Sequence, residues 1–200
     1  MVNTLSCATI YNCKLDIFWM RITKVTTKTG DAGQTSLGSG ERVKKDHPRV
    51  NLLGDLDHLN SVIGWTITSF SDNHIIEELK KIQQDIFNIS GDVSLPDRES
   101  VLLKEDRIGY IENKIDKITK ELPPLKEFIL PGGSECISRL HISRTSCRKA
   151  ERSLISMCED TELNDLHAKY MNRLSDYLFL LARFVKHTEG VNEEHWALEK

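Results

Sequence analysis

Long hydrophobic runs are absent from this chain of 200 residues. Because no stretch of about 18 apolar residues occurs, no segment is predicted to span a membrane. An excess of basic charge is also missing, since 27 Lys and Arg residues stand against 30 Asp and Glu residues and leave a net charge of −3. A protein with this balance is not built around a polyanion, so neither nucleic acid nor a membrane is expected as a partner.

Cysteine pairs are missing as well, although the sequence has five cysteines. No C-x-x-C pair occurs, which disfavours zinc ribbons and redox-active pairs. Cys147 and Cys158 lie eleven residues apart in a helical pattern and are interpreted as small buried hydrophobic residues. This use of cysteine suits a reducing compartment, so a cytoplasmic location is expected.

Targeting signals are not evident near the N-terminus. Residues 1–19 contain one basic residue, Lys14, and match neither a secretory signal peptide nor an Arg-rich transit peptide. We expect these residues to be a disordered extension without a role in the chemistry, with a cryptic targeting role as the alternative. A length of 200 residues suits one domain. The expected division is an extension over 1–19, a single helical-bundle domain over 20–190 and a C-terminal tail over 191–200.

Apolar residues recur with a period near 3.6, which predicts amphipathic helices. Residues 91–100 interrupt the pattern and are predicted to form a loop. Pro123 and Pro124 end the helix that precedes them. Long helices with modest loops, and no alternation of strands and helices, predict an all-α fold that is a five-helix bundle. The helices are expected over residues 50–70, 73–90, 105–121, 134–158 and 164–187.

A loop rich in glycine, threonine and lysine precedes the first expected helix. Glycines allow the backbone to approach a ligand closely, hydroxyl groups donate to phosphate oxygens, and lysines supply positive charge. The loop is no Walker A motif, because no Gly-Lys-Ser/Thr closes it. On composition alone, a polyphosphate site and a plain surface loop fit equally well. The loop contains Thr27, Lys28, Thr29, Gly30, Thr35, Ser36 and Lys45.

Charged residues interrupt the apolar stripe of the fourth expected helix. On a helical wheel with ~100° per residue, Arg148 falls about 40° and Glu151 about 20° from Arg144, inside the stripe. Arg152 falls at its edge, near 80°. Buried charge is costly unless it is paired or meets a charged ligand. A charged ligand, an internal Arg–Glu network and a contact between subunits all remain open as interpretations.

The fifth expected helix is apolar nearly all the way round, except near Arg173 and Asp176. A helix of this kind is buried inside a bundle or between subunits. The two charged residues are i,i+3 neighbours and are able to pair. Taken alone, such a pair is more often structural than catalytic.

A hydrophobic run, Phe128-Ile129-Leu130, ends in Pro131-Gly132-Gly133 just before the fourth expected helix. The run predicts a fixed apolar loop that enters the N-terminus of the helix. One interpretation is a connection that packs on the core. The other is a wall that presents the Phe128 ring to a large apolar ligand.

Together these motifs resemble the PduO-type ATP:cob(I)alamin adenosyltransferases. They occur in the order of that family over residues 21–186, most of the chain. Each motif alone is modest evidence, whereas the ordered set is specific. The matching segments are Thr27-Lys28-Thr29-Gly30-Asp31 with Gly33, Gly40-Glu41-Arg42, Asp57-x-Leu59-Asn60, Phe128-x-Leu130-Pro131-Gly132-Gly133, Arg144-x-x-Cys147-Arg148-Lys149-Ala150-Glu151-Arg152 and Asn172-Arg173-Leu174-Ser175-Asp176.

The resemblance implies a homotrimer of five-helix bundles with active sites between neighbouring subunits. It implies transfer of the 5′-deoxyadenosyl group of ATP to cob(I)alamin, which gives adenosylcobalamin and triphosphate. Cobalt(I) is the attacking group, so the protein positions the substrates, balances phosphate charge and makes the cobalt reducible. The substrates would be ATP and cob(I)alamin, and Mg²⁺ is expected with ATP rather than on protein ligands alone.

The resemblance also assigns roles to residues. Arg148 would carry the charge of triphosphate as it leaves, and Phe128 would displace the lower axial ligand of cobalamin. Asp57 and Arg144 would form a pair that joins subunits beside the site. Asp176 would organise the cobalamin side, with Arg173 as its contact. The implied ATP-binding residues are Thr27, Lys28, Thr29, Gly30, Thr35, Ser36, Lys45, Arg148, Lys149, Glu151, Arg152 and Asn172.

Three positions depart from the pattern of the family. Thr26 stands where Tyr is common, His58 stands where Glu follows the motif Asp, and Lys149 replaces a common Arg. Lysine keeps the positive charge of arginine but loses its two-pronged geometry. These departures bear on substrate affinity more than on the reaction.

Two functions of other classes remain open. A silent carrier on the same bundle would bind cobalamin or nucleotide without releasing triphosphate. A structural helical oligomer, whose charges lock subunits together, would bind neither. The presence of Lys28, Arg148, Glu151 and Asn172 favours the enzyme. Its expected protein partners are a flavoprotein reductase and a cobalamin-dependent mutase.

Overall fold

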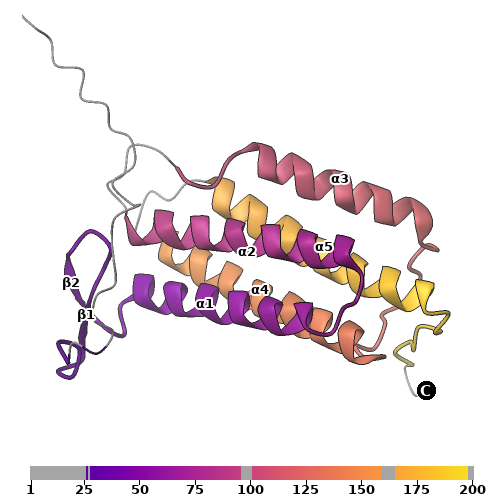
Figure 1. Cartoon of the computed structure of the whole chain (residues 1–200), viewed down its shortest axis with the longest axis horizontal. Coiled ribbons are helices and arrows are strands. Elements are labelled where there is room, and N and C mark those ends of the chain that lie inside the picture. Colours follow the sequence, from indigo (N-terminus) through magenta and orange to yellow (C-terminus); the bar gives the residue numbers. More distant parts are fainter. Residues whose placement is uncertain (1–25, 27, 96–100, 159–164, 198–200) are drawn as a thin grey trace, which may run out of the picture.

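The computed structural model describes residues 26, 28–95, 101–158 and 165–197. Within these ranges the chain forms a helical bundle with a small hairpin at one end (Figure 1). The five predicted helices are confirmed, but the chain is mostly helical rather than all-α, because β1 and β2 pair as an antiparallel hairpin. The elements are β1 (Gln34–Ser36), β2 (Arg42–Lys44), α1 (Pro48–Ile67), α2 (Asn73–Ser94), α3 (Asp106–Glu121), α4 (Glu135–Cys158) and α5 (Asp165–Thr188).

Helix starts follow from local capping chemistry. Pro48 occupies the first turn of α1, where its missing N–H costs nothing, and the His47 side chain accepts from the Arg49 N–H at 3.2 Å. Asp72 caps α2 by accepting from the His74 N–H at 2.8 Å. These caps lie close to the helix starts predicted from the hydrophobic pattern.

The helix α2 continues past its expected end to Ser94. Gly91 lies inside the helix and does not break it. A Cβ added at Gly91 would stand 2.5 Å from Leu102 Cδ1, so glycine here allows the returning chain to approach closely. The prediction of a loop over 91–100 is therefore wrong up to Ser94, and residues 96–100 lie outside the described residues.

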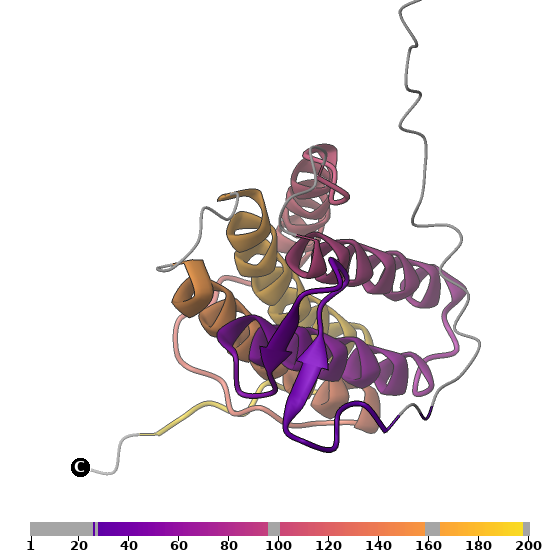
Figure 2. The same cartoon turned by 90° about the vertical axis from the view of Figure 1, so that its left-hand side faces the viewer.

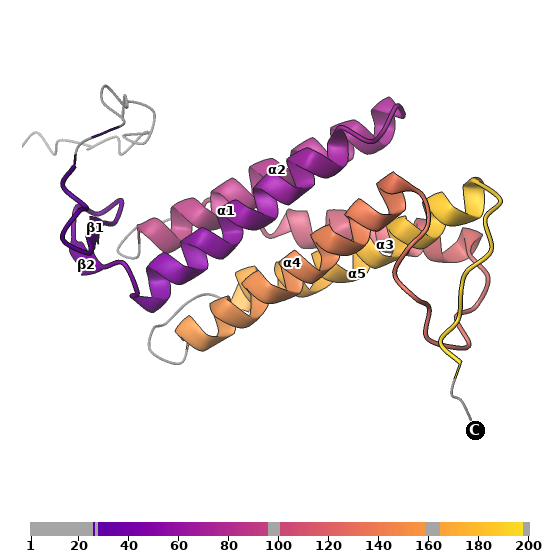
Figure 3. The ribbon, with the colours of Figure 1, turned by 90° about the horizontal axis from the view of Figure 1, so that it is seen from below.

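The helices pack as two connected pairs with α3 added at the side. The helix α1 packs against α2 and α4, and α5 packs against α4 and α3. Seen from below, α1 and α2 lie together on one side of the bundle and α4 and α5 on the other (Figure 3). None of the described helices combines the length and apolar character that crossing a bilayer requires.

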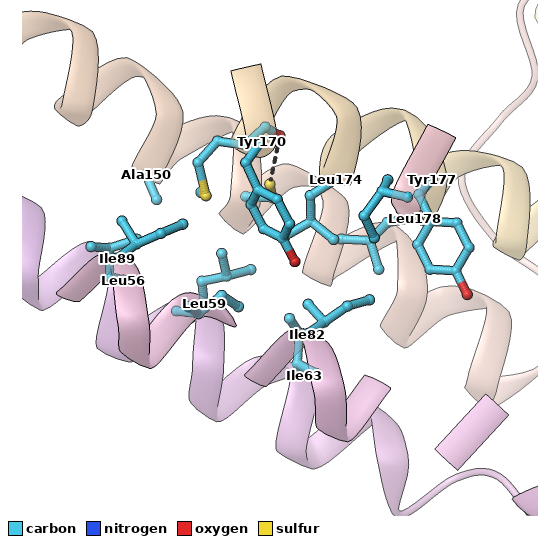
Figure 4. Close-up of a cluster of buried hydrophobic side chains, with 14 of the residues drawn as sticks. Leu56, Leu59, Ile63, Ile82, Ile89, Ala150, Tyr170, Leu174, Tyr177 and Leu178 are labelled. Carbon is cyan, nitrogen blue, oxygen red and sulfur yellow. Dashed lines mark hydrogen bonds between the residues drawn. The ribbon is translucent and has the colours of Figure 1, made fainter. Parts of the chain in front are cut away.

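Large aliphatic side chains from four helices fill the space between these pairs (Figure 4). Burying one such side chain contributes about 1.5–3 kcal/mol. Cys147 is part of this core, as predicted, whereas the side chain of Cys158 lies outside the described residues. The labelled core residues include Leu56, Leu59, Ile63, Ile82, Ile89, Ala150, Tyr170, Leu174 and Leu178.

One buried carboxylate ties three helices together. Asp85 of α2 accepts from Arg107 of α3 at 2.8 Å and from the Tyr170 hydroxyl of α5 at 2.7 Å. Burial, together with the negative charge of Asp85, raises the pKa of Tyr170 well above its ordinary value. Tyr170 therefore stays a hydrogen-bond donor to the carboxylate at neutral pH, and the buried charge is fully partnered.

The two ends of the bundle differ in what they carry. The hairpin stands at the end where α1 begins and α4 finishes (Figures 1 and 2). The segment that precedes α4 lies at the opposite end, beside the C-terminal part of the described chain (Figure 3). The fold therefore separates the predicted phosphate loop from the Phe128 loop within one chain.

Candidate functional site

The predicted phosphate loop is a turn followed by the hairpin. The N–H of Gly33 donates to the Gly30 carbonyl at 3.2 Å, and the Lys45 N–H donates to the Gly33 carbonyl at 3.0 Å. Positive φ angles occur at Gly33 (79°) and at Lys28 (59°). Because positive φ is uncommon outside glycine, Lys28 occupies a conformation that the surrounding turn has to hold.

Two basic residues contact this turn: Arg42, which begins β2, and Lys45, which follows it. A Cβ added at Gly30 would stand 3.4 Å from Lys45 Nζ, so glycine leaves room for the ammonium beside the turn. Arg42 donates to the Thr29 carbonyl at 2.9 Å and to Ser36 Oγ at 3.3 Å. Sequence reasoning missed this role of Arg42, although its position opposite Ser36 in an alternating hairpin was a usable signal.

The hairpin docks on the end of α2. Leu37 and Val43 are buried, and the Gly38 N–H donates to Ser94 Oγ at 2.9 Å. A Cβ at Gly38 would stand 2.4 Å from that oxygen, so only glycine fits without a shift. Because of this docking, the turn and Lys45 have a defined position at one end of the bundle (Figure 2). Thr35 is half-buried between the strands, and the predicted residue Thr27 lies outside the described residues.

Three charged residues of α4 lack partners. Arg148 and Arg152 are exposed and Glu151 is half-buried. In the part of the chain that the structure describes, none of the three takes part in a hydrogen bond or ion pair. The internal Arg–Glu network considered as an alternative is therefore not formed there. Free guanidinium groups on one helix face are available to an anionic ligand or a second chain.

Arg144 and His141 form a partly buried basic pair near the middle of α4. Burial and the charge of Arg148 lower the pKa of Arg144, whose Nε is buried without a partner. Burial, with the charges of Arg144 and Lys186, lowers the pKa of His141 to about 4. His141 is therefore neutral at pH 7 and packs against Phe179, with ring centroids 6.4 Å apart.

Asp57 is exposed on α1 and has no hydrogen-bond or ion-pair partner among the described residues. Arg144 faces the Phe179 ring instead, at 5.7 Å from its centroid. The expected pair between Asp57 and Arg144 is thus not made inside one chain. That pair stays a prediction about neighbouring subunits.

Lys149 has a partner that the sequence did not suggest. Its Nζ stands 2.8 Å from Asp55 Oδ1, and Ser153 Oγ donates to Asp55 Oδ2 at 2.6 Å. Asp55 lies two residues before the motif residue Asp57. The only available signal was the i,i+4 spacing of Lys149 and Ser153 on α4.

Asn172 and Asp176 are exposed on α5. The pairing with Asp176 that the spacing of Arg173 allows is not made, because Arg173 Nε donates to Glu112 Oε1 of α3 at 2.9 Å. The helix α3 packs along α5 and brings this carboxylate within reach of Arg173. Asp176 is left without a hydrogen bond or ion pair in the described chain.

The Phe128 loop is held by the segment that follows α5. The Phe128 ring is 78% exposed and meets Trp196 edge-on, with centroids 6.5 Å apart. The Trp196 N–H donates to the Phe128 carbonyl at 2.8 Å, and the Leu130 N–H donates to the Glu194 backbone carbonyl at 2.8 Å. Sequence reasoning missed Trp196, for which an aromatic residue in a polar tail was the sole signal.

An ion pair fastens this C-terminal segment to α5. Arg183 Nε stands 2.7 Å from Glu193 Oε1, and Arg183 also donates to the Pro123 carbonyl at 3.0 Å. Lys186 donates to the Gly132 carbonyl at 3.4 Å. The buried bases of α5 thus hold both the C-terminal segment and the loop that carries Phe128.

A single chain does not bring all predicted site residues together. Arg148 lies 13 residues into α4 from Glu135, which is ~20 Å along the axis from the start of the helix. The phosphate turn lies at the end of the bundle where α4 finishes, and the Phe128 loop lies at the end where α4 begins (Figure 1). Among the described residues, no group of three or more His, Cys, Asp or Glu side chains is placed to hold a metal ion.

Comparisons with known proteins agree on one family. A family model described as cobalamin adenosyltransferase matches residues 25–185. The corrinoid adenosyltransferase of Bacillus subtilis is 42% identical over 175 residues, covering 85% of this chain and 90% of that protein. The human corrinoid adenosyltransferase MMAB is 40% identical over 183 residues, covering 87% of this chain and 73% of that protein.

Solved structures give the same result. A variant of the PduO-type ATP:corrinoid adenosyltransferase from Lactobacillus reuteri, complexed with cobalamin and ATP, superposes with a TM-score of 0.83. It is 34% identical in sequence, and the match covers 88% of this chain and 100% of that one. A second variant of the same enzyme, complexed with ATP, superposes with a TM-score of 0.80 at 36% identity, covering 86% of this chain and 100% of that one.

Proposed function

The chain belongs to the cobalamin adenosyltransferase family, and from that premise we propose how its residues divide the work of the reaction. It is an ATP:corrinoid adenosyltransferase, which transfers the 5′-deoxyadenosyl group of ATP to cob(I)alamin. Cobalt(I) supplies the electron pair for the new Co–C bond, and the C5′–O bond breaks with triphosphate as leaving group. No protein nucleophile takes part.

The observation that carries the residue assignment is that Arg148 and Arg152 have no hydrogen-bond or ion-pair partner among the described residues. Cations without carboxylate partners are suited to an anion that arrives as a ligand. Arg148 stabilises the negative charge that grows on the triphosphate as the C5′–O bond breaks. Glu151 and Asn172 lie on the neighbouring helices α4 and α5 and complete the nucleotide side.

The turn before β1 binds the other phosphate oxygens. Gly30 leaves the backbone accessible, Lys45 stands beside it, and Lys28, Thr29, Thr35 and Ser36 supply cations and hydroxyl groups. Thr27, which precedes them, is assigned to the same set by its place in the sequence. Mg²⁺ enters with ATP and neutralises phosphate charge when bound.

Phe128 forms the apolar wall on the corrinoid side. Its ring is largely exposed and fixed by Trp196, so it has the rigidity to displace a ligand. Loss of the lower axial ligand leaves a four-coordinate cob(II)alamin, which is easier to reduce to cob(I)alamin. Asp176 organises this side from α5. A flavoprotein reductase is the partner that supplies the electron, and a cobalamin-dependent mutase receives the product. The proposed location of this chain and of both partners is the cytoplasm.

A homotrimer completes the site. Among the described residues, the exposed Asp57 has no hydrogen-bond or ion-pair partner, and the buried Nε of Arg144 has no hydrogen-bond partner. An unpaired buried donor is costly, so a carboxylate from a second copy stabilises the assembly. Light scattering tests this. A mass three times the 22.9-kDa chain is expected, and a stable monomer with full activity contradicts the shared site.

The activity itself is tested with purified protein, ATP, Mg²⁺ and chemically reduced cobalamin without oxygen. Decay of the cob(I)alamin absorbance is expected to match the appearance of light-sensitive adenosylcobalamin and of equimolar triphosphate. Binding of both ligands without triphosphate release would instead identify a carrier. Binding of neither would leave only a structural role.

A further inference from the structure

An ion pair joins α1 to α4 in the half of the bundle that carries the hairpin. Asp55 Oδ1 stands 2.8 Å from Lys149 Nζ, and Asp55 Oδ2 accepts from Ser153 Oγ at 2.6 Å. Each carboxylate oxygen therefore has its own partner. Because Lys149 and Ser153 are i,i+4 neighbours, both reach the carboxylate from the same side of α4.

The two members of this pair differ in their exposure to solvent. The Asp55 side chain is 15% exposed, whereas the Lys149 side chain is 60% exposed. Burial opposes ionisation of Asp55, but the hydrogen bonds from Lys149 and Ser153 outweigh it and lower the pKa of Asp55. The Asp55 carboxylate is thus a largely buried anion between α1 and α4. The Lys149 ammonium pairs with it from the solvent-exposed side.

Lys149 retains hydrogen-bonding capacity after it pairs with Asp55. An ammonium group has three N–H donors, and Asp55 accepts from one of them. The exposed ammonium is therefore able to donate to phosphate oxygens while it remains bound to Asp55.

The charges on α4 explain why such an anchor is needed. Arg144, Arg148, Lys149 and Arg152 crowd four cations into nine residues, with Glu151 as the sole anion among them. Like charges on one helix surface repel, and the flexible lysine stem offers the easiest way for a cation to move away. Asp55 supplies the attraction that holds Lys149 in place against this repulsion.

We propose that Asp55 is a positioning residue that holds Lys149 in place for the triphosphate of ATP, with Ser153 fixing the carboxylate. This inference rests on the proposed function, with Lys149 among the ATP-binding residues that the family resemblance implies. Asp55 touches no substrate and acts through Lys149. Its effect therefore falls on the affinity for ATP and passes through the lysine.

A double-mutant cycle on the full-length protein tests this coupling. The dissociation constant for ATP with Mg²⁺ is measured by calorimetry for the unaltered protein, Asp55→Asn, Lys149→Met and the double variant. Asp55→Asn is expected to weaken ATP binding roughly fivefold and Lys149→Met roughly tenfold, as for one charge-assisted contact. The double variant is expected to match Lys149→Met alone, because Asp55 has nothing left to position.

Two further variants separate positioning from general stability. Ser153→Ala keeps the charge of Asp55 and frees one of its oxygens, so a smaller loss, about twofold, is expected. Glu77→Gln removes a carboxylate that pairs with Lys80 on exposed α2, at 2.9 Å, and is expected to leave ATP affinity unchanged. The KM for cobalamin is expected to stay constant in all five variants, whereas a loosened bundle would raise it as well.

Three outcomes would overturn the proposal. In the first, Asp55→Asn leaves ATP affinity unchanged or tightens it while the unaltered protein binds ATP. In the second, the losses multiply in the double variant, which makes the two residues independent. In the third, the unaltered protein binds no ATP, which overturns the proposed function itself and is recognised without any variant.

Discussion

Trp196 lies edge-on to Phe128, with ring centroids 6.5 Å apart and a backbone hydrogen bond of 2.8 Å from the Trp196 N–H to the Phe128 carbonyl. Phe128 precedes α4 in the sequence, whereas Trp196 follows α5. Both side chains are exposed. The contact therefore serves the loop rather than the hydrophobic core. If Phe128 has the role proposed above, the segment after α5 also belongs to the corrinoid side.

The contact predicts that Trp196→Ala resembles a mild form of Phe128→Ala. Phe128→Ala is expected to abolish the absorbance of four-coordinate cob(II)alamin, and Trp196→Ala to reduce its fraction severalfold, because the ring is less firmly held. ATP affinity is expected to be unchanged in both. Val191→Ala, which alters the same segment away from the ring pair, serves as the control. An unchanged fraction of four-coordinate cob(II)alamin in Trp196→Ala would show that Trp196 does not position Phe128.

Arg148→Ala tests the charge on the leaving group. The variant is expected to lower kcat about 10²-fold, because a preorganised cation that meets developing charge contributes several kcal/mol to the transition state. Lys117→Ala removes an exposed cation of α3 and is expected to leave turnover unchanged. Full turnover in Arg148→Ala would show that triphosphate leaves without it.

Tyr170→Phe tests the buried carboxylate cluster. Removing the 2.7 Å hydrogen bond leaves Asp85 with one fewer donor, so the free energy of unfolding is expected to fall by about 1–3 kcal/mol. Tyr177→Phe is the matched control, because Tyr177 is equally buried but makes no hydrogen bond among the described residues. Urea titration of both variants measures the difference. Equal losses would mean that Asp85 does not depend on Tyr170.

His141 predicts how stability depends on pH. Its pKa falls from 6.5 to about 4 on folding, because burial and the charges of Arg144 and Lys186 disfavour the protonated form. Between these values the unfolded chain binds more protons, so the folded state loses stability as pH falls. The loss from His141 is about 2–3 kcal/mol across this window. Well above pH 6.5, where both states are neutral, this residue makes no pH-dependent contribution.

The variant His141→Gln removes this titration. Its unfolding free energy is expected to vary less between pH 7 and pH 4 than that of the unaltered protein, in about the amount given above. Asn73→Gln, which exchanges one exposed amide for another at the start of α2, is the control and is expected to keep the original pH dependence. Identical pH dependence in all three proteins would mean that His141 is not held neutral.

The sequence predicted those parts of the molecule that repeat along one helix. Leu52, Leu56, Leu59 and Ile63 recur with the helical period, and all four are buried in the core. The charged residues of α4 could be recognised for the same reason, because one helical wheel describes their directions. Periodicity is local information, and it located the helices to within a few residues at most ends.

Contacts between distant segments carried no such signal. Asp55 meets Ser153 across 98 residues of sequence, and Phe128 meets Trp196 only because α5 returns the chain to the same end. Arg173 had a plausible neighbour in Asp176, yet packing of α3 supplied Glu112 instead. Tertiary packing decides such choices, so a single sequence without its fold does not determine them.

The transfer of carbon from ATP to cobalt is the central claim, and an isotopic label follows it most directly. ATP carrying ¹³C at C5′ is mixed with cob(I)alamin, Mg²⁺ and the protein without oxygen, and the products are examined by NMR. If the protein transfers the adenosyl group, the label is expected in the Co–C bond of adenosylcobalamin, and the three phosphates leave as intact triphosphate. Label that remains in ATP, or phosphates that leave as diphosphate and phosphate without a Co–C bond, would contradict it.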